Sequence, residues 1–161
     1  MKTNSALLAG LLLVTFAMPA LCSAQEKQKQ SAPVSSPVQT VVVYQASGGN
    51  INASTALIVY TDGMSVLSCS RGGSDKISRV TAPAAKVKAL QNALLAANAL
   101  SLPSSTKPVP DIQLKIVTFF KPHNGAGQTP SNTFSYMATT GDYGKVQAAI
   151  DAFISSVFPA C

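Results

Sequence analysis

The chain has 161 residues, and 12 Lys and Arg against 6 Asp and Glu give it a formal net charge of +6 at pH 7. The basic residues are scattered, and no dense Lys/Arg run alternates with aromatic residues, so nucleic acid is excluded as an expected partner. About 120 residues follow the N-terminal segments, which is enough chain for one hydrophobic core and too little for two.

The N-terminus has the three parts of a signal peptide. Lys2 provides the positive charge, residues 6–18 form an apolar run, and the small-residue site "CSA" follows at 22–24. A signal peptidase requires small residues there, so the pattern predicts a signal peptide over residues 1–24 with cleavage before Gln25. The protein is therefore expected to be secreted or periplasmic.

A membrane-anchored form is the alternative for this segment. The apolar run is shorter than the roughly 20 residues of a membrane-spanning helix, so no integral membrane segment is expected after cleavage. Lipidation of Cys22 needs a small residue before the cysteine, whereas Leu21 stands there, which favours ordinary cleavage. Because Lys2 is the charged residue of the segment, cleavage lowers the formal net charge from +6 to +5.

Strand-forming residues follow a polar, proline-containing stretch. Residues 25–39 lack apolar periodicity, so we expect a disordered polar linker there, ahead of a single domain over residues 40–161. Asp62-Gly63 is the strongest hairpin signal of the chain. Strands are expected for "TVVVYQ" at 40–45, "TALIVY" at 55–60, "MSVLSCS" at 64–70 and, at an edge of the sheet, "KISRVT" at 76–81.

The first helix follows these strands. Thr81 and Pro83 are its expected start, and Pro103 its expected end. Its apolar face is predicted from the spacing of Val87, Leu90, Leu94 and Ala97.

Two strands and a second helix complete the domain. Residues 111–121 alternate in side-chain character, which predicts a long central strand, and 132–139 should return as its antiparallel partner. The last helix should start near Asp142, whose charge suits a helix N-terminus. The elements together predict an α+β fold, a mostly antiparallel β-sheet of four to six strands with two α-helices packed on one face. The apolar stripe expected on the last helix is Val146, Ala149, Ile150, Phe153 and Val157.

Two cysteines, Cys69 and Cys161, remain after cleavage. In an exported chain they predict one disulfide between them. Closing a loop of this size stabilises the fold by about 4 kcal/mol in the chain-entropy model. No metal site is expected, because two cysteines and a single histidine provide too few zinc ligands.

Residues suited to catalysis are few. His123 lies in a predicted loop, and a small hydrolase that uses it is the weakest of the functions considered. No serine lies in a G-x-S-x-G elbow, and no carboxylate pair is singled out. The chain is therefore expected not to be an enzyme and to need no cofactor. Each carboxylate of the domain has an expected structural role at a turn, at a strand start or in a helix. These residues are Asp62, Asp75, Asp111, Asp142 and Asp151.

A glycine-containing connection, "YQASGGNIN", lies between the first two expected strands. It lacks the lysine and the Ser or Thr of a P-loop, and no helix follows it, so a phosphate-binding role is rejected. Two interpretations remain open, a plain hairpin turn and a loop presented to a partner. The candidate partner-binding residues are Ser47, Gly48, Gly49 and Asn50.

Three short pieces of the sequence carry a resemblance to a known family. They are Ser47-Gly48-Gly49 after the first strand, "PAAKVKALQNALLAANALSLP" from Pro83 to Pro103, and Pro110-Asp111 before the long strand. In this order, over roughly residues 40–158, the chain resembles the emfourin family of proteinaceous inhibitors of thermolysin-like metallopeptidases. The resemblance implies a partner instead of a substrate, with the glycine-containing connection offered to a peptidase cleft.

The chain departs from that family at Asn50-Ile51-Asn52, in its two cysteines and in the longer loop "PHNGAGQTPS". The leading interpretation is an exported, monomeric, non-enzymatic binding domain whose partner is a secreted metallopeptidase or another envelope protein. The alternative is a cell-envelope accessory or structural protein whose sheet edge or loops pair with an envelope component.

Overall fold

The computed structural model describes residues 37–49, 53–105, 109–121 and 127–159, within a compact unit that spans Ser35–Cys161. The predicted signal peptide and most of the predicted linker lie outside the described residues. Gln39, the last residue of that linker, is buried. Its backbone N–H donates to the Thr61 hydroxyl and its carbonyl accepts from the Thr61 N–H, at 3.0 and 2.8 Å. Ordered contacts of the sheet therefore begin before β1.

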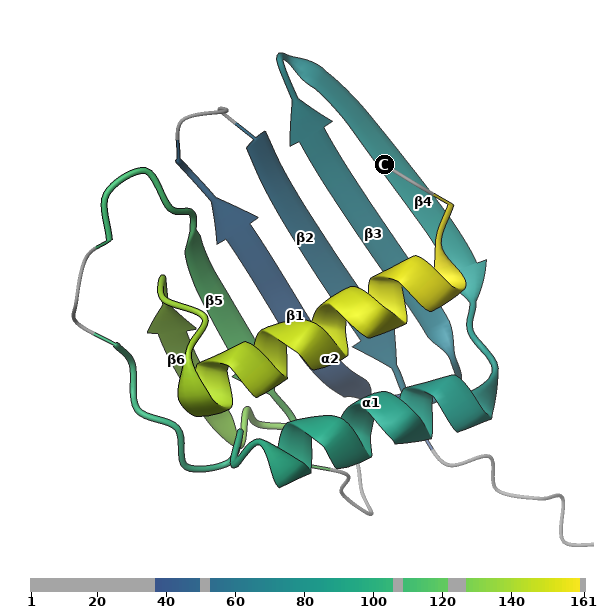
Figure 1. Ribbon diagram of the computed structural model, residues 1–161. Coiled ribbons are helices and arrows are strands. Elements are labelled where there is room, and N and C mark those ends of the chain that lie inside the picture. Colours follow the sequence, from purple (N-terminus) through teal and green to yellow (C-terminus); the bar gives the residue numbers. More distant parts are fainter. Residues whose placement is uncertain (1–36, 50–52, 106–108, 122–126, 160–161) are drawn as a thin grey trace, which may run out of the picture. The chain divides into compact units, whose positions relative to one another are not determined.

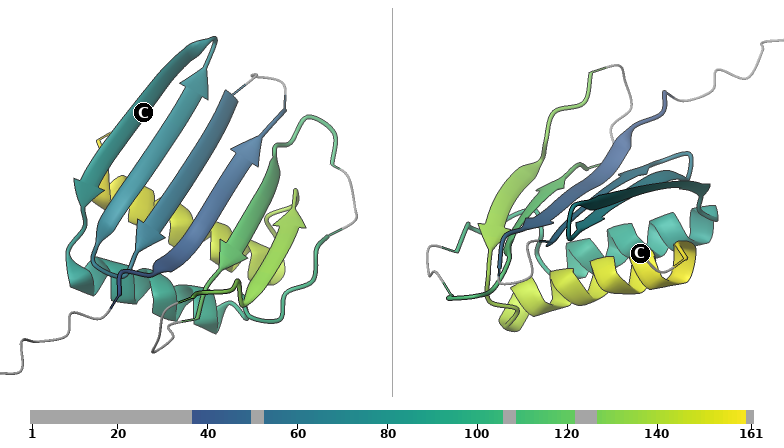
Figure 2. Two further views of the ribbon diagram at one scale, coloured as in Figure 1. Left: turned by 180° about the vertical axis from the view of Figure 1, so that it is seen from behind. Right: turned by 90° about the horizontal axis from the view of Figure 1, so that it is seen from above.

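In the described part of the chain, one six-stranded sheet is covered on one face by two helices (Figures 1 and 2). Every strand pair is antiparallel, and the strand order is β4-β3-β2-β1-β5-β6. The predicted α+β architecture is thus confirmed. The elements are β1 Thr40–Ser47, β2 Ala53–Tyr60, β3 Met64–Arg71, β4 Ser74–Thr81, α1 Ala84–Ala96, β5 Leu114–Phe119, β6 Asn132–Tyr136 and α2 Gly141–Val157.

Strand register decides which residues face the helices. Tyr44 pairs with Leu57 and Val117, and Leu57 pairs with Leu67, so one buried row crosses four strands. A bulge between Thr40 and Val42 lets the adjacent Val41 and Val42 both be fully buried. The largest fully buried side chains of the described residues are Tyr136, Phe119, Phe134, Leu57, Leu67, Leu94, Ile150, Val41, Val42, Val59, Val117 and Val146.

Helix α1 begins and ends differently from the prediction. Thr81 is the last residue of β4, and Pro83 is the N-cap without any side-chain cap bond. The helix ends well before Pro103, because Asn98 adopts the left-handed conformation at φ 58°. Its N–H donates to Leu95, and the next N–H, of Ala99, donates to Leu94, both at 3.0 Å. These are the two hydrogen bonds of a Schellman C-cap. The predicted apolar face is correct: Val87, Leu90, Leu94 and Ala97 are all buried.

The predicted long central strand at 111–121 is wrong in length and in place. Asp111 has φ 64°, which breaks the extended backbone, and Ile112 is exposed, so β5 begins only at Leu114. Strand β5 is second from an edge, and β1 lies between β2 and β5. Alternation indicated a strand here, but alternation carries no information about neighbouring strands.

Helix α2 agrees with the prediction. It starts one residue before Asp142, and Thr140 is its N-cap. Of the predicted stripe, Val146, Ile150 and Phe153 are buried, while Ala149 and Val157 are partly buried against the core.

Candidate functional site

The end of the β1–β2 hairpin contains the partner-loop residues that the sequence singled out. Ser47, Gly48 and Gly49 are exposed, and Asn50 lies outside the described residues. Gly48 and Gly49 have φ angles of 86° and 77°, a left-handed conformation that glycine adopts without steric cost. The chain therefore turns between two antiparallel strands, as predicted, and presents bare backbone at the turn.

A segment distant in the sequence braces this connection on both sides. A Cβ atom on Gly49 would lie 3.2 Å from the backbone oxygen of Asp111 and 3.4 Å from the side chain of Gln113. The Nε2 atom of Gln113 also donates a hydrogen bond of 2.8 Å to the backbone oxygen of Ala53. On the two sides of positions 50–52, the segment that leads into β5 thus lies close against Gly49 and hydrogen-bonds to Ala53.

The sequence did not indicate this brace. It predicted Asp111 at a strand start, whereas Asp111 lies in a turn before β5. The available signal was Pro110, since proline followed by aspartate is frequent in turns. The contact with Gly49 depends on β5 pairing with β1, which no local pattern reveals.

The β3–β4 turn lies at the same end of the sheet as this hairpin (Figure 1). A cavity of about 450 Å³ opens at this end, where Arg71 and Lys76 provide cationic groups above small and hydroxyl side chains. The Arg71 guanidinium in this lining suits contact with acidic or carbonyl groups. The lining residues are Ala53, Ser54, Thr55, Cys69, Ser70, Arg71, Ser74, Lys76 and Gln113.

A second cavity, of about 290 Å³, lies between the sheet and α2 and shares Thr55, Cys69 and Gln113 with the first. A polar network closes one side of it. The Oε1 atom of Gln147 accepts hydrogen bonds from the Tyr136 and Tyr44 hydroxyls at 3.0 and 3.4 Å.

The same glutamine connects this network to a charge. Its Nε2 atom donates to the Asp151 carboxylate at 2.8 Å. Burial raises the pKa of both Tyr44 and Tyr136, with the Asp151 charge acting in the same direction. Burial lowers the pKa of Lys115, and Asp151 opposes that shift. Lys115 also lies 5.8 Å above the Tyr136 ring, close enough for a cation–π contact. All of these groups have partners, so the network is a packed, satisfied polar cluster.

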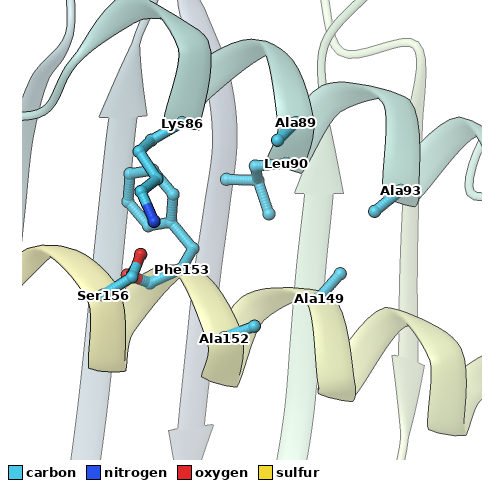
Figure 3. Close-up of a pocket in the computed structure, with 8 residues that line it drawn as sticks. All are labelled: Lys86, Ala89, Leu90, Ala93, Ala149, Ala152, Phe153 and Ser156. Carbon is cyan, nitrogen blue, oxygen red and sulfur yellow. The ribbon is translucent and has the colours of Figure 1, made fainter.

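A third cavity, of about 250 Å³, separates the two helices (Figure 3). Alanines from both helices face each other across it, and Phe153 and Leu90 form its apolar wall. Lys86 and Ser156 provide its polar atoms. The small side chains explain the space, and its lining offers no convergent polar set for a ligand.

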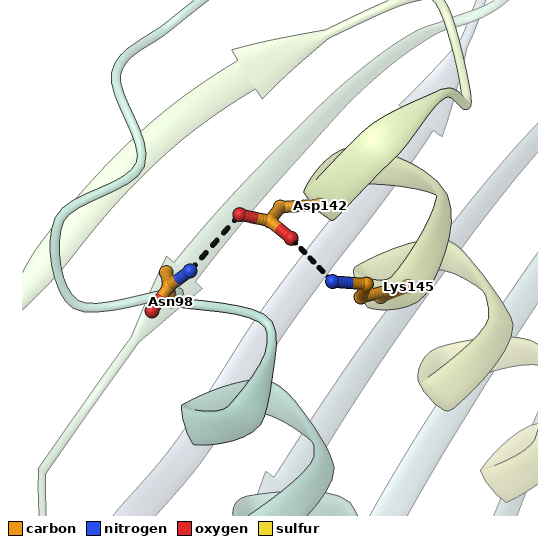
Figure 4. A network of polar contacts seen from close by, with 3 residues as sticks. All are labelled: Asn98, Asp142 and Lys145. Carbon is orange, nitrogen blue, oxygen red and sulfur yellow. Dashed lines mark hydrogen bonds and ion pairs between the residues drawn. The ribbon is translucent and has the colours of Figure 1, made fainter.

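At the N-terminal end of α2, Asp142 links this helix to the residue that follows the C-cap of α1 (Figure 4). Its Oδ2 atom accepts from the Asn98 amide at 2.9 Å, and its Oδ1 atom pairs with the Lys145 ammonium at 2.8 Å. Hydrogen bonds from Lys145 and Asn98 lower the pKa of the Asp142 carboxyl. Asp142 thus has a structural role, as the sequence predicts. Asp62 has one too, because its carboxylate accepts a hydrogen bond from the Met64 N–H in the β2–β3 turn.

Of the cysteines and the histidine considered as candidates, the structure describes only Cys69. His123 and Cys161 lie outside the described residues, and the structure places Cys69 on the helix-facing side of β3, partly buried against the core. Within the described ranges, no three His, Cys, Asp or Glu side chains gather as a metal site would require. None of the helices in those ranges is long and apolar enough to cross a membrane.

Comparison of the chain with models of known protein families and with curated protein sequences gives no match.

Proposed function

We propose that this protein is an exported, non-enzymatic binding domain that presents the end of its β1–β2 hairpin to a partner protein, a secreted thermolysin-like metallopeptidase. The observation that carries the proposal is the bracing of an exposed glycine turn by Asp111 and Gln113. An inhibitor has to offer a segment whose conformation is held before binding, because ordering a flexible loop in a cleft costs affinity.

The glycines suit this use for a second reason. No atom of the described residues beyond its chain neighbours lies within 4 Å of the Cβ position of Gly48. The described backbone there is therefore open to a partner on the side where a side chain would project. A peptidase cleft binds its ligand largely through backbone hydrogen bonds, and bare backbone allows the closest approach.

The contact between Gly49 and Asp111 also supports the partner class. Ser47-Gly48-Gly49 and Pro110-Asp111 are two of the three pieces on which the resemblance to emfourin inhibitors rests, and they are far apart in the sequence. Gly49 and Asp111 lie against each other at one end of the sheet. Two of the matching pieces therefore lie on one surface of this protein, where a single partner can contact both.

The test uses a pair of matched substitutions in the mature protein. Gly48→Asn adds a side chain at the proposed contact, and Gly72→Asn adds the same side chain in the neighbouring β3–β4 turn. Both glycines have positive φ, and there is space for a side chain at both, because no described residue beyond the chain neighbours has an atom within 4 Å of the Cβ position. Asparagine tolerates that backbone conformation. We expect stoichiometric inhibition of a thermolysin-like peptidase by the unmodified protein, an inhibition constant raised at least about tenfold by Gly48→Asn, and no change with Gly72→Asn.

Absence of inhibition by the unmodified protein across a panel of thermolysin-like peptidases would remove that partner class. Inhibition that Gly48→Asn leaves unchanged would instead show that the contact lies elsewhere on the domain. Thermal denaturation of each variant serves as the folding control.

A cell-envelope accessory function is the second candidate, and the uncovered face of the sheet favours it. No described helix covers that face, which contains partly buried Val43, Ile58, Val66 and Ile116 in adjacent strands. A contiguous apolar face on an exported domain is typical of an interaction surface. Copurification with envelope fractions, without any effect on peptidases, would favour this candidate over the first.

A further inference from the structure

Strand β4 is an edge of the sheet along its whole length. Within the described residues it pairs only with β3, and no other segment described there bonds to the backbone of Asp75, Ile77 or Arg79. An edge with unpaired N–H and C=O groups is a template for another strand. The opposite edge, β6, differs, because Ser104 and Ser105 bond to the backbone of Ser135.

The hairpin turn determines which β4 groups point outward. Gly72 and Gly73 both have positive φ, and Arg71 pairs with Ser74, so a two-residue type I′ turn joins β3 to β4. The closing pair of such a hairpin exchanges both backbone hydrogen bonds, and this pattern repeats at every second residue. The even-numbered residues of β4 therefore bond to β3. The backbone groups of Asp75, Ile77 and Arg79 point away from it, to the outer side of the edge.

The side chains of the same residues lie on the uncovered face. Lys76 and Val80 face the helix side, where they line a cavity or pack on the core, and side chains alternate along a strand. Ile77 is 62% exposed, more than any other large hydrophobic residue of the described chain. Asp75 and Arg79 flank it with opposite charges, and neither side chain has an ion-pair partner among the described residues.

Charged residues on an edge strand usually prevent pairing, but here their order makes one self-pairing register favourable. We propose that two copies of this protein associate through β4, antiparallel, about a twofold axis at Ile77. Ile77 then pairs with Ile77 of the second copy. Asp75 lies opposite Arg79 of the second copy, and Arg79 lies opposite its Asp75. Each such pair exchanges two backbone hydrogen bonds, and opposite charges face each other across the strands.

Other symmetric registers lack this match. Centring on Asp75 or on Arg79 places two like charges opposite each other, which is destabilising. Centring on Lys76 or Ser78 leaves the charges without opposite partners. In the Ile77 register, Lys76 lies opposite Ser78 on the helix side, so no like charges meet there.

The resulting dimer has one continuous sheet with the helices of both copies on the same face, because the twofold axis is perpendicular to the sheet. The β1–β2 hairpin ends of the two copies point in opposite directions and stay uncovered. The inference is therefore independent of the proposed inhibitor function. It differs from the monomer that the sequence led us to expect, because the register with β3, which the sequence does not give, decides that Asp75, Ile77 and Arg79 point outward.

The test is a charge exchange read by sedimentation equilibrium of the mature protein. We expect a reversible, concentration-dependent dimer in the presence and absence of reductant. Asp75→Arg and Arg79→Asp should each raise the dimer dissociation constant at least about tenfold, because each creates like-charge pairs at two symmetric positions. The double variant Asp75→Arg with Arg79→Asp restores opposite charges and should recover the dissociation constant of the unmodified protein.

Lys121→Asp, on an exposed position after β5 and away from β4, is the matched control for altered net charge and should leave the dissociation constant unchanged. Circular dichroism checks the fold of each variant. A protein that is monomeric at its highest soluble concentration would overturn the proposal. So would a dimer that dissociates only on reduction, which would indicate an intermolecular disulfide, or a double variant no better than the single ones. Binding of a foreign extended peptide by a monomeric protein would assign the edge to another partner.

Discussion

At the scale of single residues, Gln147 has more consequence than its sequence position suggests. It is the hydrogen-bond partner of both the Tyr44 and the Tyr136 hydroxyl, and Tyr136 is fully buried. A buried hydroxyl without a partner loses the free energy of its bond with water and gains nothing in return. One amide thus allows two tyrosines to lie between the sheet and α2.

We predict that Gln147→Leu destabilises the protein more than Tyr136→Phe does. The leucine leaves two hydroxyls unpaired, at about 1–3 kcal/mol for a buried group, whereas the phenylalanine removes a hydroxyl and leaves Gln147 its bonds with Tyr44 and Asp151, at about 1 kcal/mol. Urea denaturation gives both free energies of unfolding. Equal stability of the two variants would contradict the importance given to the glutamine.

At the scale of elements, the entry into α2 is constrained by a close approach of backbone. Gly144 lies in the first turn, and a Cβ atom there would lie 2.6 Å from the backbone oxygen of Thr139. Real Cβ atoms do not come so close to a carbonyl oxygen, so the chain path into the helix requires glycine at this position.

Gly144→Ala is therefore predicted to destabilise the protein by about 1–3 kcal/mol, as overpacking does, although alanine is favoured over glycine in a free helix by about 1 kcal/mol. Ser155→Ala, on the exposed side of the same helix, is the control and should stay within about 0.5 kcal/mol of the unmodified protein. The midpoints of thermal unfolding separate these outcomes. An alanine variant at 144 that is more stable than the unmodified protein would show that the helix entry can shift.

At the scale of the whole molecule, the predicted Cys69–Cys161 disulfide would link the C-terminal end of the chain covalently to the sheet. Cys69 lines the same cavity as Ile154 of α2. The last turns of α2 therefore lie close to β3, where a bridge from a residue shortly after the helix is within reach. Cys161 lies outside the described residues, so the pairing stays a prediction.

If the bridge forms, Cys69→Ser, Cys161→Ser and the double variant should each lose about 4 kcal/mol, because all three remove the same cross-link. The measurement is urea unfolding in the absence of reductant, with thiol titration of the denatured protein to count free cysteines. Losses that add up in the double variant, or free thiols in the unmodified protein, would exclude the bridge.

Much of the fold was predictable from the sequence, because the residue pattern of each segment indicates whether it forms a strand or a helix. Strand-forming runs on either side of the Asp62-Gly63 hairpin signal located β2 and β3, and the 3.6-residue spacing located the buried faces of both helices. The residues at which helices and strands end were harder to predict. Asn98 ends α1 by adopting a left-handed conformation that several other residues can also adopt, so proline seemed the better stop signal.

By itself, the sequence determined the α+β class, the type and order of the elements, and the glycine turn at 48–49, because these depend on neighbours along the chain. The sequence also predicted the strand at 76–81 to lie at an edge, and the strand order confirms this. Only the tertiary structure decided that Asp111 and Gln113 lie against this turn and that Ile77 is on the uncovered face. Those features depend on strand order, which is set by the packing of residues far apart in the sequence, and no local pattern encodes it.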